Sequence, residues 1–242
     1  MFPKWFTYLP GLRQTLSRRD RRSQRPTRPG RPRLCIETLE VRAVPAVVTW
    51  DGGGGNFNWN TAANWSADVL PGPSDDVEIG TSFAAATITS TSNVSIHSLT
   101  SQASLIVSGG ELLAATDSHL YSALTVSGTF GGAGNTTVAG LFAWNNGTLQ
   151  GVAGAGSLTA NGGTAIVGSY ATLSGGFHYL NPVGQSATWR GEVRMAQGAT
   201  FENAGTIDLL TDGYAATSED VESEFLNSGT LVKTAEIGRA HV

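Results

Sequence analysis

The sequence predicts an all-β fold, a right-handed parallel β-helix, from three observations. Glycine is abundant, at 31 of 242 residues, and only 14% of residues are charged, so the chain lacks the Glu, Lys, Ala and Leu runs of solvent-exposed helices. Apolar runs are short and are separated by turn residues. One five-residue pattern, Asn-x-Gly-Thr-aliphatic, recurs at 145–149, 203–207 and 227–231.

The recurring pattern predicts tight corners that lead into short strands. Asn favours a turn, Gly is free to adopt a positive φ, and the β-branched Thr favours the start of a strand. The copies begin at Asn145, Asn203 and Asn227, so the first gap is more than twice as long as the second. A unit of roughly 19 to 24 residues would fit three times into the longer gap, which is typical of stacked repeats. We therefore expect the three copies to be corners of a solenoid.

Residues 1–45 form a basic leader. They hold eleven of the fifteen Lys and Arg residues against three acidic ones, and Pro and Gly interrupt them. Such a segment cannot bury a core, so we expect it to be disordered and solvated. The alternatives are contact with an anionic lipid or polymer and a nucleic-acid-binding arm. The rest of the chain has four basic and sixteen acidic residues, which disfavours nucleic-acid binding by the body.

No segment of the sequence matches a membrane span or an ordinary export signal. There is no run of eighteen apolar residues, so we expect no transmembrane helix. The apolar stretch 5–9 is too short for a secretory signal. Ser17-Arg18-Arg19 is followed by further charges, whereas a twin-arginine signal continues with apolar residues.

The end of the leader carries a short motif, which includes Leu39-Glu40, Arg42, Pro45 and Ala46. It resembles the Leu-Glu-x-Leu-Glu-x-Arg-x-x-Pro-Ala segment near the start of many large surface or extracellular proteins of planctomycete bacteria. Ile36-Glu37 replaces the first Leu-Glu. The resemblance implies an extracellular or cell-surface location. The alternative is a short amphipathic segment without a targeting role.

Residues 46–83 are rich in Trp, Gly and Asn and predict an N-terminal cap. Trp50, Trp59 and Trp65 are half of the tryptophans in the chain. Large rings on loops bury much area at low entropic cost, so they can close one end of a solenoid. The segment, with Pro71 and the following Asp-x-Val-x-Ile pattern, resembles the opening that precedes β-helical repeats in bacterial surface and autotransporter-like proteins.

We expect residues 84–235 to form the β-helix repeats. About seven rungs at the ~4.8 Å spacing of strands would give a stack roughly 35 Å long. Ser108-Gly109-Gly110 and Ser174-Gly175-Gly176 are expected to be corners. A β-sandwich is the alternative, because regularly spaced short strands also describe that class. The expected strands are 86–89, 94–99, 105–107, 124–126, 157–160, 164–167, 187–190 and 192–195.

The sequence predicts no catalytic, cofactor-binding or metal-binding residue. The single Cys35 excludes an intrachain disulfide, and His97, His119 and His178 lack ligand spacing. Arg190, Glu192 and Arg194 alternate, so in a strand they would form an ion-paired ladder on one exposed face, for which catalysis is a minor alternative. The Gly run 52–55 has no Lys or helix after it and is no phosphate loop.

Two acidic segments have structural interpretations. Asp75 and Asp76 are expected to cap the turn into a strand at 77–79. The acidic cluster 218–224 lacks the alternating ligands of a calcium loop and is expected to be a solvated loop.

The last seven residues, 236–242, match the translation of a sequencing adapter, so we expect them to be an artefact and the natural chain to continue. The sequence favours a non-catalytic structural or adhesive stalk, the N-terminal fragment of a large surface or secreted protein. Its possible partners are glycans or neighbouring surface polymers. The alternative is a fragment of a carbohydrate-active β-helix enzyme, a polysaccharide lyase or hydrolase.

Overall fold

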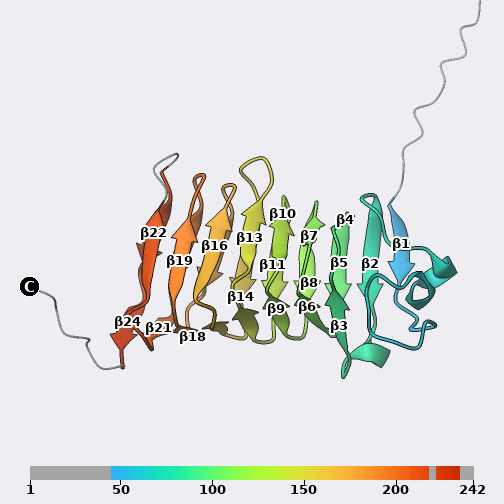
Figure 1. Ribbon diagram of the computed structural model, residues 1–242, viewed down its shortest axis with the longest axis horizontal. Coiled ribbons are helices and arrows are strands. Elements are labelled where there is room, and N and C mark those ends of the chain that lie inside the picture. Colours follow the sequence, from blue (N-terminus) through green and yellow to red (C-terminus); the bar gives the residue numbers. More distant parts are fainter. Residues whose placement is uncertain (1–44, 218–221, 235–242) are drawn as a thin grey trace, which may run out of the picture. The chain divides into compact units, whose positions relative to one another are not determined.

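A computed structural model describes residues 45–217 and 222–234. The chain folds into a β-solenoid built from three parallel sheets, which we call A, B and C (Figure 1). The predicted leader up to residue 44 and the predicted artefact at 236–242 lie outside the described residues.

Each sheet collects every third strand of the repeat region. Sheet A contains β3 (Thr87–Ser90), β6 (Ser104–Val107), β9 (Leu124–Val126), β12 (Phe142–Trp144), β15 (Thr164–Ile166), β18 (Ser186–Trp189), β21 (Thr206–Leu209) and β24 (Thr230–Lys233). Sheet B contains β4 (Val94–Ile96), β7 (Glu111–Ala114), β10 (Thr129–Gly132), β13 (Thr148–Gly151), β16 (Tyr170–Ser174), β19 (Glu192–Met195) and β22 (Tyr214–Thr217). Sheet C contains β1 (Ala46–Thr49), β2 (Asp75–Ile79), β5 (Ser98–Ser101), β8 (Ser118–Leu120), β11 (Asn135–Val138), β14 (Ser157–Ala160), β17 (His178–Asn181), β20 (Thr200–Asn203) and β23 (Glu224–Asn227).

The chain passes through sheets A, B and C in turn, and we call one such circuit a rung. From β3 to β23 it completes about seven rungs, and β24 begins the next. Every pair of neighbouring strands is parallel, and partners in the repeats belong to successive rungs: Thr87 pairs with Ser104, and Thr206 pairs with Thr230. This topology confirms the predicted parallel β-helix and excludes the β-sandwich, whose sheets are antiparallel.

The strands form because apolar and hydroxyl-bearing residues alternate. In β9, Leu124 and Val126 are buried while Thr125 faces outward. Because side chains in a strand alternate between the two faces, one row of each strand fills the interior and the other faces solvent. The buried rows of the three sheets form one continuous hydrophobic core along the stack.

The tryptophan-rich segment before the first rung packs against the N-terminal end of the core. It contains β1 and the short 3₁₀ helices η1 (Ala62–Asn64), η2 (Ser66–Asp68) and η3 (Thr81–Phe83). Trp50, Trp59 and Trp65 are all buried. The ring of Trp65 lies edge-on to both others, with centroid distances of 4.8 Å to Trp50 and 4.7 Å to Trp59. Edge-to-face contact is a favoured arrangement of aromatic rings.

Hydrogen bonds fix the cap internally and join it to the first rung. The buried Asn64 accepts from the Gly54 N–H at 3.0 Å and donates from Nδ2 to the Asn58 carbonyl at 3.0 Å. The Trp59 N–H donates to the Thr89 carbonyl at 2.9 Å, which extends sheet A by one bridge before β3. The cap therefore supplies hydrogen-bond partners to a strand that would otherwise be an open edge.

The three Asn-x-Gly-Thr copies are corners, but they are not at equivalent positions. The copies at 203–207 and 227–231 both connect sheet C to sheet A, and their strands stack in register. The copy at 145–149 connects sheet A to sheet B. A single repeat period across the longer gap is therefore wrong, because one pattern serves two different corners.

The glycines in these corners are needed for space and not for a positive φ, contrary to the expectation. None of Gly147, Gly205 and Gly229 has a positive φ; at the first corner Asn146 takes that conformation instead, at +57°. A Cβ at Gly205 would lie 2.3 Å from the carbonyl oxygen of Gln185, on the preceding rung. The corner stacks backbone on backbone, and a side chain does not fit.

The expected strands are present in the repeats, with one division. The run 94–99 is two strands, β4 and β5, with a corner at His97 between sheets B and C. Both expected Ser-Gly-Gly corners are confirmed, at the ends of β6 and β16. The runs were too short to show where one sheet ends and the next begins.

Candidate binding surfaces

The predicted charged ladder is present in part, on the outer face of sheet B. Arg194 Nε lies 2.9 Å from Glu192 Oε1, and Arg194 Nη2 lies 3.4 Å from Glu192 Oε2. Arg190 does not share this face. It lies at the corner between β18 and β19, where the following Gly191 has a φ of +77° and turns the chain. The alternation predicted for three residues therefore holds for Glu192 and Arg194.

Two tyrosines from the neighbouring strands complete a cluster around this ion pair. Tyr170 and Tyr214 are the register partners of Glu192 on its two sides, in β16 and β22. The Tyr214 hydroxyl donates to Glu192 Oε2 at 3.0 Å. The guanidinium carbon of Arg194 lies 5.2 Å from the centre of the Tyr170 ring, a cation–π contact. We call these four residues the tyrosine–arginine cluster.

The hydrogen bonds of the cluster set the charge of its members. The bond from Arg194, with a smaller contribution from Tyr214, holds the pKa of the Glu192 carboxyl below its usual range. The same carboxylate raises the pKa of the Arg194 guanidinium and that of the Tyr214 hydroxyl. At neutral pH the cluster therefore presents the Glu192 carboxylate, the Arg194 guanidinium and the neutral Tyr214 hydroxyl, beside the ring of Tyr170.

The two tyrosines were not predicted from the sequence. Tyr170, Glu192 and Tyr214 are evenly spaced along the chain, and their spacing falls within the repeat period that the Asn-x-Gly-Thr copies indicated. Because rungs differ in length, this even spacing does not by itself show that the three residues are neighbours in register.

The three histidines of the repeats lie near sheet C, each with its own partner. His97 Nδ1 is 2.7 Å from Asp76 Oδ1, and His178 Nε2 is 3.0 Å from Glu202 Oε2. His119 Nδ1 is 2.9 Å from the Thr137 hydroxyl. Within residues 45–217 and 222–234, no group of three or more His, Cys, Asp or Glu side chains is placed to hold a metal ion.

Of the two acids predicted to cap a turn, only Asp75 does so. Asp75 caps the turn as expected, because its Oδ2 accepts from the Gly72 N–H at 2.8 Å. Asp76 instead contacts the next rung, where it accepts from the Ser98 hydroxyl and pairs with His97. These two hydrogen bonds, Ser98 first, hold the pKa of the Asp76 carboxyl below its ordinary value.

The outer face of sheet C is a ladder of hydroxyl, amide and carboxylate groups that bond from rung to rung. Ser157 Oγ donates to Asn135 Oδ1 at 2.8 Å, and Asn135 Nδ2 donates to Asp117 Oδ1 at 3.0 Å. A second ladder runs along the corner between sheets C and A, where Asn181 Nδ2 donates to Asn203 Oδ1 and Asn203 Nδ2 to Asn227 Oδ1, both at 2.7 Å. The rungs are therefore joined by side chains as well as by backbone.

The acidic cluster lies only partly in the described residues. Positions 218–221 are outside them, and the expected solvated loop is therefore described only from Glu222 onward. Glu222 is exposed, whereas Glu224 is the first residue of β23 and pairs with Thr200.

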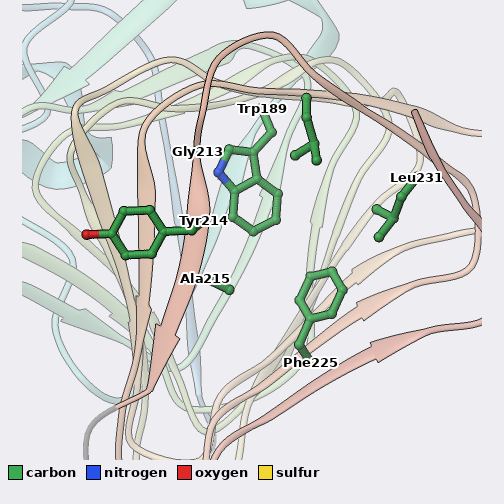
Figure 2. A pocket seen from close by; sticks show the side chains of 7 residues that line it. Trp189, Gly213, Tyr214, Ala215, Phe225 and Leu231 are labelled. Carbon is green, nitrogen blue, oxygen red and sulfur yellow. The ribbon is translucent and has the colours of Figure 1, made fainter. Parts of the chain in front are cut away.

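An apolar hollow lies at the last described rung. Its lining includes Trp189, Phe225 and Leu231, which converge in Figure 2, and its volume is about 180 Å³. Tyr214 contributes to the wall, but its ring points away from the other labelled side chains. The core residues of this rung are thus partly accessible, while the tyrosine–arginine cluster faces outward.

No protein-family model, curated protein or solved structure matches the chain. Among the residues that the structure describes, no helix has the length and apolar character needed to cross a membrane. The function is therefore inferred from the geometry of the solenoid and of its outer faces.

Proposed function

We propose that the protein is a non-catalytic structural or adhesive stalk that acts at the cell surface or in the extracellular medium. The observation that carries this proposal is the continuous stack of about seven rungs whose side-chain ladders run parallel to the stacking direction. At the ~4.8 Å spacing of strands, this stack is roughly 34 Å long.

The way the rungs are held together suits a load-bearing rod. Each rung contacts its neighbours through three parallel sheets, so stability comes from one interface after another along the stack. The ladders of Asn181, Asn203 and Asn227 add side-chain hydrogen bonds to these interfaces. Asn181 and Asn203 are buried, where a hydrogen bond left unmade is costly.

The outer faces also support an adhesive role. The outward rows of sheets A and C include many Ser and Thr side chains at regular spacing, for example Thr137 and Thr159, which are register partners on sheet C. Such groups can both donate and accept hydrogen bonds, so a ladder of them can contact a polymer repeatedly without rearrangement. The motif at 39–46 is consistent with a surface location by its resemblance to planctomycete surface proteins.

Two measurements on the full chain test this proposal. Pulling on both termini in a force spectrometer is expected to give successive unfolding steps of roughly one rung each, because neighbouring rungs are the stabilising units. Incubation with a panel of plant and bacterial polysaccharides is expected to release no new reducing ends and no unsaturated products. Product release that scales with protein concentration would overturn the proposal in favour of the alternative, a polysaccharide lyase or hydrolase.

A further inference from the structure

The tyrosine–arginine cluster on sheet B combines two exposed aromatic rings with a charged pair between them. Tyr170 is 49% exposed and Tyr214 is 58% exposed, although large aromatic side chains usually bury most of their surface. Both stand on the outer face of the sheet, two strands apart, with Glu192 directly between them in register. The rings are therefore presented to solvent at a fixed separation and not as isolated surface residues.

The geometry of the cluster matches a ligand that lies along the stack. Neighbouring strands are about 4.8 Å apart, so Tyr170 and Tyr214 stand roughly 10 Å apart along the stacking direction. An extended sugar polymer repeats at intervals close to the strand spacing, so alternate sugars could stack on the two rings. The apolar face of a sugar ring packs well on an aromatic face. A tyrosine side chain has only two rotatable bonds, so holding its ring in place costs little conformational entropy.

The charged pair between the rings suits the hydroxyl groups of such a ligand. Arg194 is 60% exposed and uses two of its five N–H donors on Glu192, so three remain available. The Glu192 carboxylate can accept further bonds beside those from Arg194 and Tyr214. A few oriented polar groups among aromatic surfaces are typical of specific ligand sites. The pair has no net charge, which favours an uncharged ligand.

We propose that Tyr170, Glu192, Arg194 and Tyr214 form a binding site for a neutral, extended polysaccharide that lies along sheet B. In this site the Tyr214 ring and the face of the Tyr170 ring that Arg194 does not cover stack on alternate sugars. Arg194 and Glu192 hydrogen-bond the hydroxyl groups of the sugar between them. The site rests on the proposed adhesive role and names the class of polymer that the stalk would hold.

The test measures binding of the full chain to xylan, glucomannan and laminarin by affinity electrophoresis and titration calorimetry. We expect binding to at least one of these neutral polymers. Tyr170→Ala and Tyr214→Ala are each expected to weaken it about tenfold or more, as hot-spot aromatic residues do. Tyr214→Phe keeps the ring and is expected to retain most of the affinity. Arg194→Gln is expected to weaken binding severalfold.

Tyr121→Ala is the matched control, because Tyr121 is 55% exposed and lies outside the cluster, between β8 and β9. It is expected to bind like the unchanged protein. The site is overturned if no neutral polymer binds, if only an acidic polymer such as polygalacturonate binds, or if the two alanine variants bind as tightly as the control. Binding that persists in those variants would leave the adhesive role intact, whereas polymer cleavage would overturn that role itself.

Discussion

The first rungs and the last rungs of the solenoid differ in length and in the side chains that fill their cores. Early strands pair with partners that are close in the sequence, as Thr87 does with Ser104. From β11 onward the partners lie further along the chain, as Thr206 and Thr230 do, so each later rung uses more residues. Among buried residues 88–138, Phe130 is the single aromatic residue. Buried residues beyond 138 include the aromatic residues Phe142, Trp144, Phe177, Tyr179, Trp189 and Phe201.

The aromatic residues of the later rungs form a connected stack along the core. Tyr179 and Phe201 have ring centroids 4.6 Å apart, and Phe201 is 5.2 Å from both Trp189 and Phe225. The strands themselves stay short throughout, so the added residues of the longer rungs lie in the corners. Larger side chains and longer corners therefore occur together, and we infer that the longer corners give the rings room.

Truncation of the aromatic stack should give the largest effect. Phe201→Ala is expected to cost about 3–5 kcal/mol of the free energy of unfolding, because Phe201 is fully buried and contacts three other rings. Urea denaturation followed by tryptophan fluorescence would measure this cost.

Phe130→Ala is the matched control in the early rungs. Phe130 is equally buried, but among the described residues no aromatic ring is paired with it. The difference between the two variants isolates the contribution of the rings to one another, and we expect Phe201→Ala to cost at least about 1 kcal/mol more. Equal costs would show that the two regions differ in composition but not in how their cores are stabilised.

Substitutions of corner glycines should have similar effects in the early and the later rungs. A Cβ at Gly134, in the early rungs, would lie 1.9 Å from the Thr116 carbonyl oxygen, and one at Gly205, in the later rungs, 2.3 Å from that of Gln185. Gly134→Ala and Gly205→Ala are each expected to lower the free energy of unfolding by about 1–3 kcal/mol, since backbone must shift to admit the methyl group. Thermal denaturation of both variants would measure it.

Gly80→Ala provides the control, because a Cβ there meets nothing within 4 Å and its φ is −74°. It is expected to be neutral or slightly stabilising. If the Gly205 variant were tolerated and the Gly134 variant were not, then the longer corners of the later rungs would be looser than the close approach indicates.

The solenoid could be predicted from the sequence, because it depends on local patterns. Trp50, Trp59 and Trp65 lie close together in the sequence, and their arrangement in loops identified a cap without any knowledge of register. The corner glycines were also recognisable, although close backbone approach and not a positive φ explains Gly147 and Gly205.

The register could not be predicted, and the binding cluster depends on it. Tyr170, Glu192 and Tyr214 are evenly spaced, but other rungs differ in length, so a single repeat period does not fix the register of the strands. The long gap between the first two copies of the corner pattern also suggests a repeat period that the structure does not have. Arg190 shows that even the position of a corner within a few residues could not be predicted from the sequence. It alternates with Glu192 and Arg194 in the sequence, yet a glycine corner separates it from their strand.

The smallest effect concerns the outer face of the early rungs, where Asp76 pairs with His97 and Ser98. Because these partners lower the pKa of the Asp76 carboxyl, its contribution to stability is complete above the unfolded value of about 3.9 and is lost as the pH falls through the lower folded value. The side chain is 36% exposed, so solvent screening should keep this contribution below about 1 kcal/mol. Asp76→Asn is expected to lower the melting temperature slightly at pH 6 and to match the unchanged protein near pH 2. An equal deficit at both pH values would show that the side chain acts through packing and not through its charge, and the outer face would then contribute to stability as the core does.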